Sequence, residues 1–170
     1  MANVLVSIGS NQDREKNITA SLDALSRSFG ELALSSIYES ESVGFKGDNF
    51  LNLVAQFETD LSVAELSAYL KRLEDENGRC RTDPKFSGRT LDVDILTYDE
   101  LTGDCDGINL PRGEILYHAF VLWPLAELVP NSCHPVTGES YQSLWQAFDK
   151  SSQKLWTIDF TWQGKLVSKQ

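Results

Sequence analysis

Cysteine is scarce in this chain of 170 residues. Its three cysteines, Cys80, Cys105 and Cys133, are odd in number and form no Cys-x-x-Cys pair, so the sequence supports neither a disulfide framework nor a zinc site. Long apolar runs are also missing. The N-terminal run at residues 4–8 is too short for a signal peptide or a membrane span, and no other run is long enough. These absences predict a protein of the reducing cytoplasm without a membrane partner.

Positive charge is in short supply as well. The chain has 15 Lys and Arg against 25 Asp and Glu, a net charge of −10 and a pI near 4.6. No broad basic face can be built from these residues, so nucleic acid is not an expected partner. The length suits one domain with its own core. We expect a monomeric domain over residues 1–160 and a polar tail over 161–170 that frays.

One short segment runs against the acidic character of the chain. Residues 79–89 carry a net charge of +3, which leaves −13 for the rest. The cations of the segment are Arg79, Arg81, Lys85 and Arg89. It contains Asp83-Pro84 and Ser87-Gly88 and has no apolar periodicity. We therefore expect a loop that is mobile when empty and closes over a bound anion as a lid.

A strand with two acidic positions follows directly, at residues 90–98. Asp92 and Asp94 alternate there with apolar residues, so both carboxylates lie on one face of the strand, about 7 Å apart at the backbone. Magnesium is commonly held by one or two carboxylates, with phosphates and waters completing the shell. The neighbouring cations can bind phosphate oxygens. The segment thus predicts a magnesium–nucleoside triphosphate site. A half-exposed antiparallel strand has the same alternation, although Asp is a poor strand residue.

The order of elements predicts an α+β fold. Strand patterns at 3–8, 32–38, 49–58 and 90–98 are separated by two helical patterns, one ending at Phe29-Gly30 and one between a Ser62/Glu65 capping box and Asn77-Gly78. This βαββαβ order is the split βαβ of ferredoxin-like folds, an antiparallel sheet flanked by helices, with the fourth strand outside the first. Further C-terminal elements are expected: a strand at 108–110, helices at 117–128 and 142–148, and a strand at 154–160. Pro124 is expected to break the first of these helices or to begin a second turn.

Four stretches of the sequence carry a resemblance to a known family. They are IGSN at 8–11, FLN at 50–52, the eleven residues FSGRTLDVDIL at 86–96 and FVLWPL at 120–125. In order and spacing they resemble the 6-hydroxymethyl-7,8-dihydropterin pyrophosphokinases of folate biosynthesis, over roughly residues 3–135. The resemblance implies a ferredoxin-like fold and two Mg²⁺ ions. It also implies transfer of pyrophosphate from ATP to the pterin hydroxymethyl group, with release of AMP.

The resemblance also implies roles for individual residues. Asp92 and Asp94 would bridge the two metals, and Arg79 and Arg89 would act on the triphosphate from the loop. The nucleotide would further contact Glu74, Arg81, Lys85, Phe86, Ile95, Arg112 and His118. The pterin ring would lie between Phe50 and Phe120, with its polar edge at Asn52 and with backbone contacts from the loop that includes Ser40 and Val43.

The chain also departs from the family pattern. It has Lys85, Phe86 and Gly88 where the family has Arg, Trp and Pro, Arg112-Gly113 in place of a His-Tyr pair, His118 in place of Arg, and Glu41 and Ser42 in place of two prolines. Two other functions stay open on the residues alone. The first is a diverged pterin- or nucleotide-binding relative with little or no turnover. The second is a nucleotidyl transferase or cyclase that uses only the two aspartates.

Overall fold

The computed structural model describes residues 1–41, 49–77, 91–151 and 153–170. Within them, a six-stranded sheet has the order β5-β1-β4-β3-β8, and β2 also pairs with β4. The first elements are β1 (Ala2–Ser10), α1 (Arg14–Phe29), β2 (Ala33–Leu34), β3 (Tyr38–Ser40), β4 (Phe50–Thr59), α2 (Val63–Glu76) and β5 (Asp92–Tyr98). All pairings in this sheet are antiparallel, and β5 flanks β1 at the outer edge. The predicted α+β split βαβ arrangement is confirmed.

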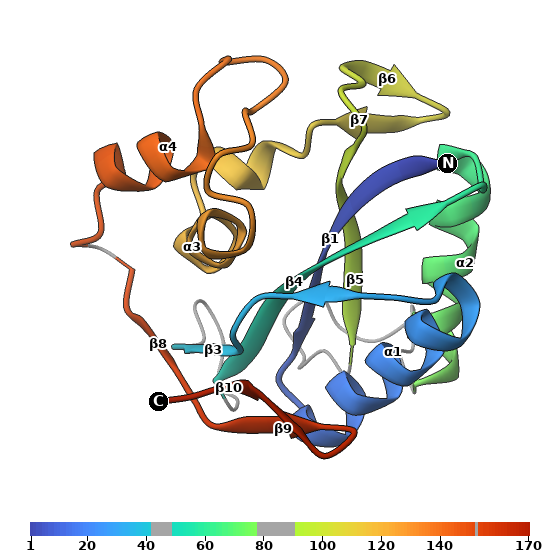
Figure 1. The fold of residues 1–170 in the computed structure, drawn as a ribbon, viewed down its shortest axis with the longest axis vertical. Coiled ribbons are helices and arrows are strands. Elements are labelled where there is room, and N and C mark those ends of the chain that lie inside the picture. The colour runs from blue at the N-terminus through green and yellow to red at the C-terminus, as the bar shows by residue number, and fades with distance from the viewer. Residues whose placement is uncertain (42–48, 78–90, 152) are drawn as a thin grey trace, which may run out of the picture.

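The two faces of the sheet are covered differently (Figure 1). Alternate residues of the three long strands, such as Val6, Leu53 and Val93, pack with α1 and α2 in the larger core. The opposite face has a smaller core, in which Leu5, Val54 and Leu96 meet the helices that follow β5. Because side chains alternate along a strand, the remaining residues of that second face extend beyond the small core. They form the floor of the site described below.

The chain after β5 covers the second face with its helices, while its hairpins add to the larger core. It forms the hairpin β6 (Gly103–Cys105) and β7 (Ile108–Leu110), a 3-10 turn (Gly113–Leu116), α3 (Ala119–Leu128), α4 (Tyr141–Ala147) and β8 (Leu155–Thr157). The last two strands are β9 (Phe160–Trp162) and β10 (Lys165–Ser168). In Figure 1, α3 and α4 lie across the sheet from α1 and α2.

Three sequence predictions are wrong in detail. The strand expected at 32–38 is two short strands, because Ser35 Oγ accepts a hydrogen bond from Val54 N (2.9 Å) and interrupts the ladder. Pro124 lies inside α3 without breaking it, since packing of a helix that is apolar nearly all round outweighs one lost backbone bond. The strand expected at 154–160 is likewise divided between β8 and β9.

The expected frayed tail is also wrong. Residues of the range 161–170 complete the antiparallel β9–β10 hairpin. The hairpin is fixed to α1, where Trp162 Nε1 donates to Asp23 Oδ1 at 2.9 Å, and buried Ser168 lies against the Ile37 carbonyl at 3.3 Å. Phe160, Trp162 and Val167 of the hairpin pack on the larger core. The segment is polar in composition, so the sequence did not indicate that these aromatic and aliphatic side chains are buried and hold it in place.

The capping box that begins α2 is confirmed. Ser62 Oγ accepts from Glu65 N at 3.1 Å, and Glu65 Oε1 accepts from Ser62 N at 2.9 Å. Hydrogen bonds from the backbone N–H and the side chain of Ser62 hold the pKa of the Glu65 carboxyl below its usual range. The two bonds satisfy backbone N–H groups that have no partner within the helix.

Loss of this cap provides a test of stability away from the site. Ser62→Ala is expected to lower the free energy of unfolding by about 1 kcal/mol, which corresponds to a fall of about 2–4 °C in Tm for a chain of this size. Thermal unfolding followed by circular dichroism measures it. Ser67→Ala, on the same helix, is the matched control. Equal Tm values for Ser62→Ala and the wild type would contradict the role of the cap.

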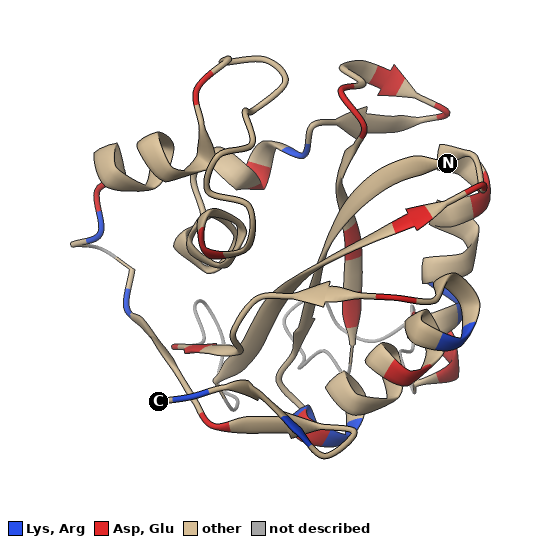
Figure 2. Ribbon diagram, in the orientation of Figure 1, with Lys and Arg blue, Asp and Glu red and all other residues tan. Residues whose placement is uncertain are grey.

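Acidic positions are spread over β5, β6 and α2 in the charge view (Figure 2).

Among the described residues, none of the helices has both the length and the apolar character needed to cross a membrane.

Candidate active site

The floor of the site is set by the register of the three central strands. On β1, Gly9 pairs with Asn52 of β4 on one side and with Asp92 of β5 on the other. Two residues earlier, Ser7 pairs with Val54 and Asp94. The middle strand therefore presents two small side chains between the aspartates and Asn52. Since neighbouring strands are about 4.8 Å apart, the rows of Asp92 and Asn52 are separated by about 10 Å across this low floor.

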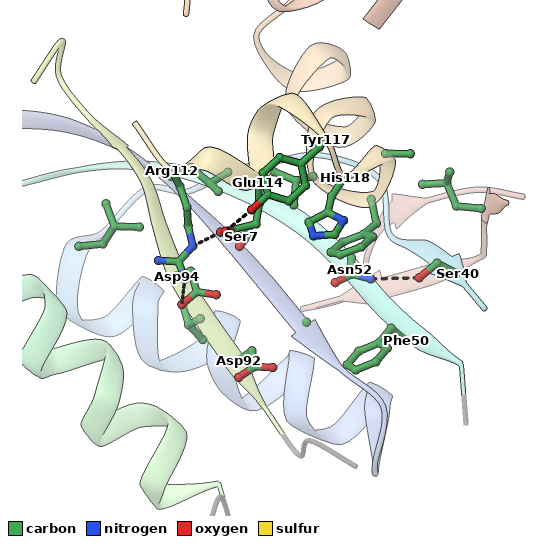
Figure 3. Close-up of a pocket in the computed structure, with 18 of the residues that line it drawn as sticks. Ser7, Ser40, Phe50, Asn52, Asp92, Asp94, Arg112, Glu114, Tyr117 and His118 are labelled. Carbon is green, nitrogen blue, oxygen red and sulfur yellow. Dashed lines mark hydrogen bonds and ion pairs between the residues drawn. The ribbon is translucent and has the colours of Figure 1, made fainter. Parts of the chain in front are cut away.

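A cavity of about 1050 Å³ lies over this floor. Its walls come from β5 and the residues after it, the start of α3, and the chain around β3 and β8. Small-molecule sites are commonly 300–1,000 Å³, so the space is large enough for two ligands side by side. Figure 3 shows Asp92, Asp94 and Arg112 at one end and Phe50, Asn52 and Ser40 at the other.

Asp92 and Asp94 lie on the same face of β5, as the alternation predicts, and both border the cavity. Glu74 of α2 is buried, and its Oε2 accepts a hydrogen bond from Val93 N at 2.8 Å. This bond holds the outer edge of β5 at the residue between the two aspartates. Glu74 is thus not a solvated surface acid. Through Oε2, its carboxylate fixes the strand that carries the candidate metal ligands.

Arg112 connects to Asp94 from the other side. Its Nη2 lies 3.7 Å from Asp94 Oδ1, and its Nε donates to Glu114 Oε2. Tyr117 Oη donates to the other Glu114 oxygen at 3.0 Å, which raises the pKa of the Tyr117 hydroxyl. Glu114 therefore fixes the direction of the Arg112 guanidinium (Figure 3).

A β-bulge helps to place Arg112. The β1–β5 register shifts between Leu5 and Val6, so that Leu96 is an extra residue on β5. The Leu96 carbonyl accepts a hydrogen bond from Arg112 N at 2.9 Å. Bulges commonly redirect a strand next to a functional site, and here the bulge ties the backbone of Arg112 to the aspartate strand.

His118 lies between two aromatic rings at the roof of the cavity. Its ring centroid is 4.7 Å from that of Tyr117 and 4.6 Å from that of Phe120, with which it is stacked at 26°. Burial lowers the pKa of His118, against a smaller opposite effect of the Glu114 carboxylate. Burial thus disfavours the charged form of the His118 imidazole.

The end of the cavity formed by β4 is polar in its middle and aromatic at its rim. Asn52 is buried, and its Nδ2 lies 3.4 Å from Ser40 Oγ. A Cβ added to Gly9 would lie 2.6 Å from Asn52 Oδ1, so any other residue at that position would force the Asn52 amide to shift. Gly9 thus allows Asn52 to lie flat along the floor. Phe50 and Phe120 are half-buried and border the same cavity.

The structure brings most of the predicted residues together. Glu74, Asp92, Asp94, Ile95, Arg112, His118, Ser40, Phe50, Asn52 and Phe120 all border the cavity. The side chain of Ile95 belongs to the larger core, so any contact of this residue with a ligand is not made from the floor of the site. The predicted residues Val43, Arg79, Arg81, Lys85, Phe86 and Arg89 lie outside the described residues, as do the departures Ser42 and Gly88.

Sequence reasoning missed Gly9 and Ser7 as parts of the floor, and it missed Glu114 and Tyr117 as partners of Arg112. The signal for Gly9 was its place in the IGSN motif, which contributed to the family resemblance but was given no role in the site. Glu114 has a weaker signal, an acid two residues from the cation Arg112. Neither pairing follows from local spacing, since both depend on strands and turns meeting in space.

Comparison with known proteins agrees with this geometry. Residues 5–130 match the family model of 7,8-dihydro-6-hydroxymethylpterin-pyrophosphokinase. A 2-amino-4-hydroxy-6-hydroxymethyldihydropteridine pyrophosphokinase of Aquifex aeolicus is 33% identical over 80% of this chain and 86% of its own length. One of Pseudomonas aeruginosa is 37% identical over 75% of this chain and 81% of its own length.

Solved structures with the same fold include a Plasmodium falciparum HPPK-DHPS, wild type with SDX-DHP. Its TM-score is 0.70 at 13% sequence identity, and the match covers 99% of this chain and 49% of that one. This chain therefore spans about half the length of that structure, and the likeness at this identity concerns the fold alone. The sequence relatives and the family model carry the assignment: the chain belongs to the 7,8-dihydro-6-hydroxymethylpterin-pyrophosphokinase family and is a diphosphokinase.

Proposed function

We propose that the protein transfers the β,γ-pyrophosphoryl group of ATP to the hydroxymethyl group of 6-hydroxymethyl-7,8-dihydropterin. In this reaction the hydroxymethyl oxygen forms a bond to the β-phosphorus, the bond from that phosphorus to the oxygen bridging to the α-phosphate breaks, and AMP leaves. The hydroxyl proton passes to solvent. The observation that carries the proposal is one cavity that is bordered both by the Asp92/Asp94 pair and by Asn52, Phe50 and Phe120.

Asp92 and Asp94 suit magnesium by their chemistry. Among the described residues, no three His, Cys, Asp or Glu side chains gather around a common point, and two carboxylates alone are a common protein share of a magnesium shell that phosphates complete. Bound magnesium would neutralise phosphate charge and hold the attacking and leaving oxygens in line. The proposed number of ions is two.

Arg112 is proposed to bind the nucleotide phosphates. The Arg112–Asp94 pair is open to solvent, with the side chains 36% and 42% exposed, and such pairs contribute only about 0–1 kcal/mol. Arg112 can therefore leave Asp94 for a phosphate at little cost, while Glu114 keeps it at the site. His118 would supply ring contacts. The residues of the loop at 79–89 are proposed to add the remaining cations.

The pterin is proposed to lie over Gly9, with its polar edge at Asn52. Phe50 and Phe120 would contact the ring faces, at about 0.5–1.5 kcal/mol for each aromatic pair beyond the area buried. Ser40, which lies beside Asn52, holds the amide in place. Phosphoryl transfer needs mainly positioning and charge neutralisation. The distance of about 10 Å between the two rows of residues would let both substrates meet over the floor.

One assay separates this activity from the alternative of a binding protein without turnover. The purified protein is incubated with ATP and magnesium, with and without the hydroxymethylpterin, and AMP is measured. An enzyme releases AMP only when the pterin is present. A protein that binds the pterin and an unreactive ATP analogue but releases no AMP would be the diverged relative instead.

Replacing Arg112 tests both its ion pair with Asp94 and its proposed contact with the nucleotide phosphates. Without the guanidinium, the potential around Asp92 and Asp94 becomes more negative. Arg112→Gln is therefore expected to bind Mn²⁺ a few-fold more tightly in the absence of nucleotide and to bind an ATP analogue several-fold more weakly. Titration of free Mn²⁺ by electron paramagnetic resonance measures the first effect. Arg27→Gln, an exposed change of equal charge on α1, is the control, and a weaker Mn²⁺ affinity in Arg112→Gln would contradict the pairing.

Phe120→Ala tests the pterin end. The variant is expected to raise the dissociation constant of the hydroxymethylpterin about tenfold, because one ring contact and its buried area are lost. The affinity for an ATP analogue should change little. Isothermal titration of each ligand decides the matter. If both affinities fall equally, Phe120 is a packing residue and the proposed stacking is wrong.

We also propose that the protein acts as a monomer in the cytoplasm. Light scattering coupled to size-exclusion chromatography tests the first point, and a mass of 19.0 kDa is expected. Fractionation of the source cells tests the second.

A further inference from the structure

Gln153 makes two hydrogen bonds that connect the C-terminal part of the chain to the roof of the cavity. Its Oε1 accepts from Ala119 N at 2.7 Å, and its Nε2 donates to the Tyr117 carbonyl at 3.0 Å. The two bonded residues flank His118 on both sides. Gln153 lies outside residues 5–130, the part of the chain that matches the family model.

The bond to Ala119 fixes the start of α3. The first N–H groups of a helix have no partner within the helix and need one from elsewhere. His118, the N-cap residue, makes no capping bond with its side chain in the described structure. Gln153 fills this place from 34 residues away. It thereby fixes the backbone from which the stacked rings of His118 and Phe120 project.

The same segment is attached at its other end to the pterin side of the cavity. Directly after Gln153, β8 pairs with β3, and Leu155 lies opposite Ser40. Gln153, Lys154 and Leu155 all border the cavity. The segment 153–157 therefore crosses from the start of α3 to the strand of Ser40, and its first three residues form part of the cavity wall.

We propose that Gln153 is a positioning residue for the pterin site, acting through the backbone of residues 117–119 to set the Phe120 ring. The inference rests on the function proposed above and deepens it. The C-terminal segment is thus a wall of the substrate site.

The test uses Gln153→Met, which keeps the length of the side chain but removes both hydrogen bonds. The dissociation constant of the hydroxymethylpterin, measured with an unreactive ATP analogue present, is expected to rise about tenfold, while that of the analogue rises less than about threefold because phosphate contacts dominate its binding. Gln153→Glu keeps the acceptor for Ala119 N and should lose less affinity for the pterin. Gln146→Met, an exposed glutamine on α4, is the matched control.

A double-mutant cycle separates positioning from general loosening. If Gln153 acts through Phe120, the Gln153→Met/Phe120→Ala protein binds the pterin no more weakly than Phe120→Ala alone. Additive losses, wild-type affinity in Gln153→Met, or an equal loss in Gln146→Met would each overturn the inference. The wild-type protein distinguishes the two levels: if it does not bind the pterin at all, the proposed function fails. If it binds and Gln153→Met matches it, only the role of Gln153 fails.

Discussion

Asp94→Asn is expected to lower turnover by about 10³-fold or more. Charge stabilisation by a bound metal is worth several kcal/mol in such reactions, and each 1.4 kcal/mol corresponds to a factor of ten in rate. Asparagine keeps the shape of the side chain but removes the negative charge that would attract the metal. The ion pair that Asp94 forms with Arg112 in the wild type is long and half-exposed, so its loss should hardly change the Tm.

The measurement is the rate of AMP formation at saturating ATP, magnesium and pterin, together with a melting curve. Asp60→Asn, an exposed aspartate after β4, is the matched control and should keep wild-type turnover. A rate for Asp94→Asn within tenfold of the wild type would remove Asp94 from the proposed metal site. A large fall in Tm would instead assign it to the fold.

Gly9→Ala has the second largest expected effect, from a single added methyl group. Its Cβ would lie 2.6 Å from Asn52 Oδ1, and Asn52 is only 8% exposed. The amide must turn away from the floor and lose its place beside Ser40. Without the Asn52 amide in place, the polar edge of the pterin loses its hydrogen-bonding partner, and the site no longer favours rings that carry that edge. The KM for the pterin should therefore rise on the order of 10- to 100-fold, with a smaller change in the KM for ATP.

Steady-state kinetics with each substrate varied in turn measure this effect. Gly113→Ala is a suitable control, because its Cβ meets only the Tyr117 ring, at an ordinary 3.7 Å. An unchanged pterin KM in Gly9→Ala would show that Asn52 does not read the substrate. Equal rises in both KM values would point to a disturbed sheet rather than to a lost pterin contact.

The sequence was most informative where the interactions are local. The capping box of α2 and the placing of Asp92 and Asp94 on one face depend on spacings of two and three residues, and both predictions are confirmed. The strand order followed from the number and sequence of elements, because a split βαβ unit has few allowed connections. The match of the aspartate strand to a known family then identified residues that border one cavity.

Other features depend on contacts between distant segments, which no local pattern reveals. The close approach of Gly9 and Asn52 requires the register of β1 on β4. In the sequence, Glu74 looks like any solvent-exposed acid on a helix, yet tertiary packing directs its carboxylate to the edge of β5. The tail was misjudged because its polar residues hide a hairpin held by Trp162 and Ser168. The basic loop at 79–89 lies outside the described residues, and its role as a lid stays a prediction.

Phosphorus NMR of the reaction mixture shows directly whether one cavity transfers pyrophosphate from ATP to the pterin. When the protein, magnesium and ATP are combined with 6-hydroxymethyl-7,8-dihydropterin, we expect AMP and a pterin diphosphate ester in equal amounts. The ATP signals should not change when the pterin is left out. Formation of ADP and phosphate, or release of AMP without the pterin, would contradict the assignment of one cavity to both substrates.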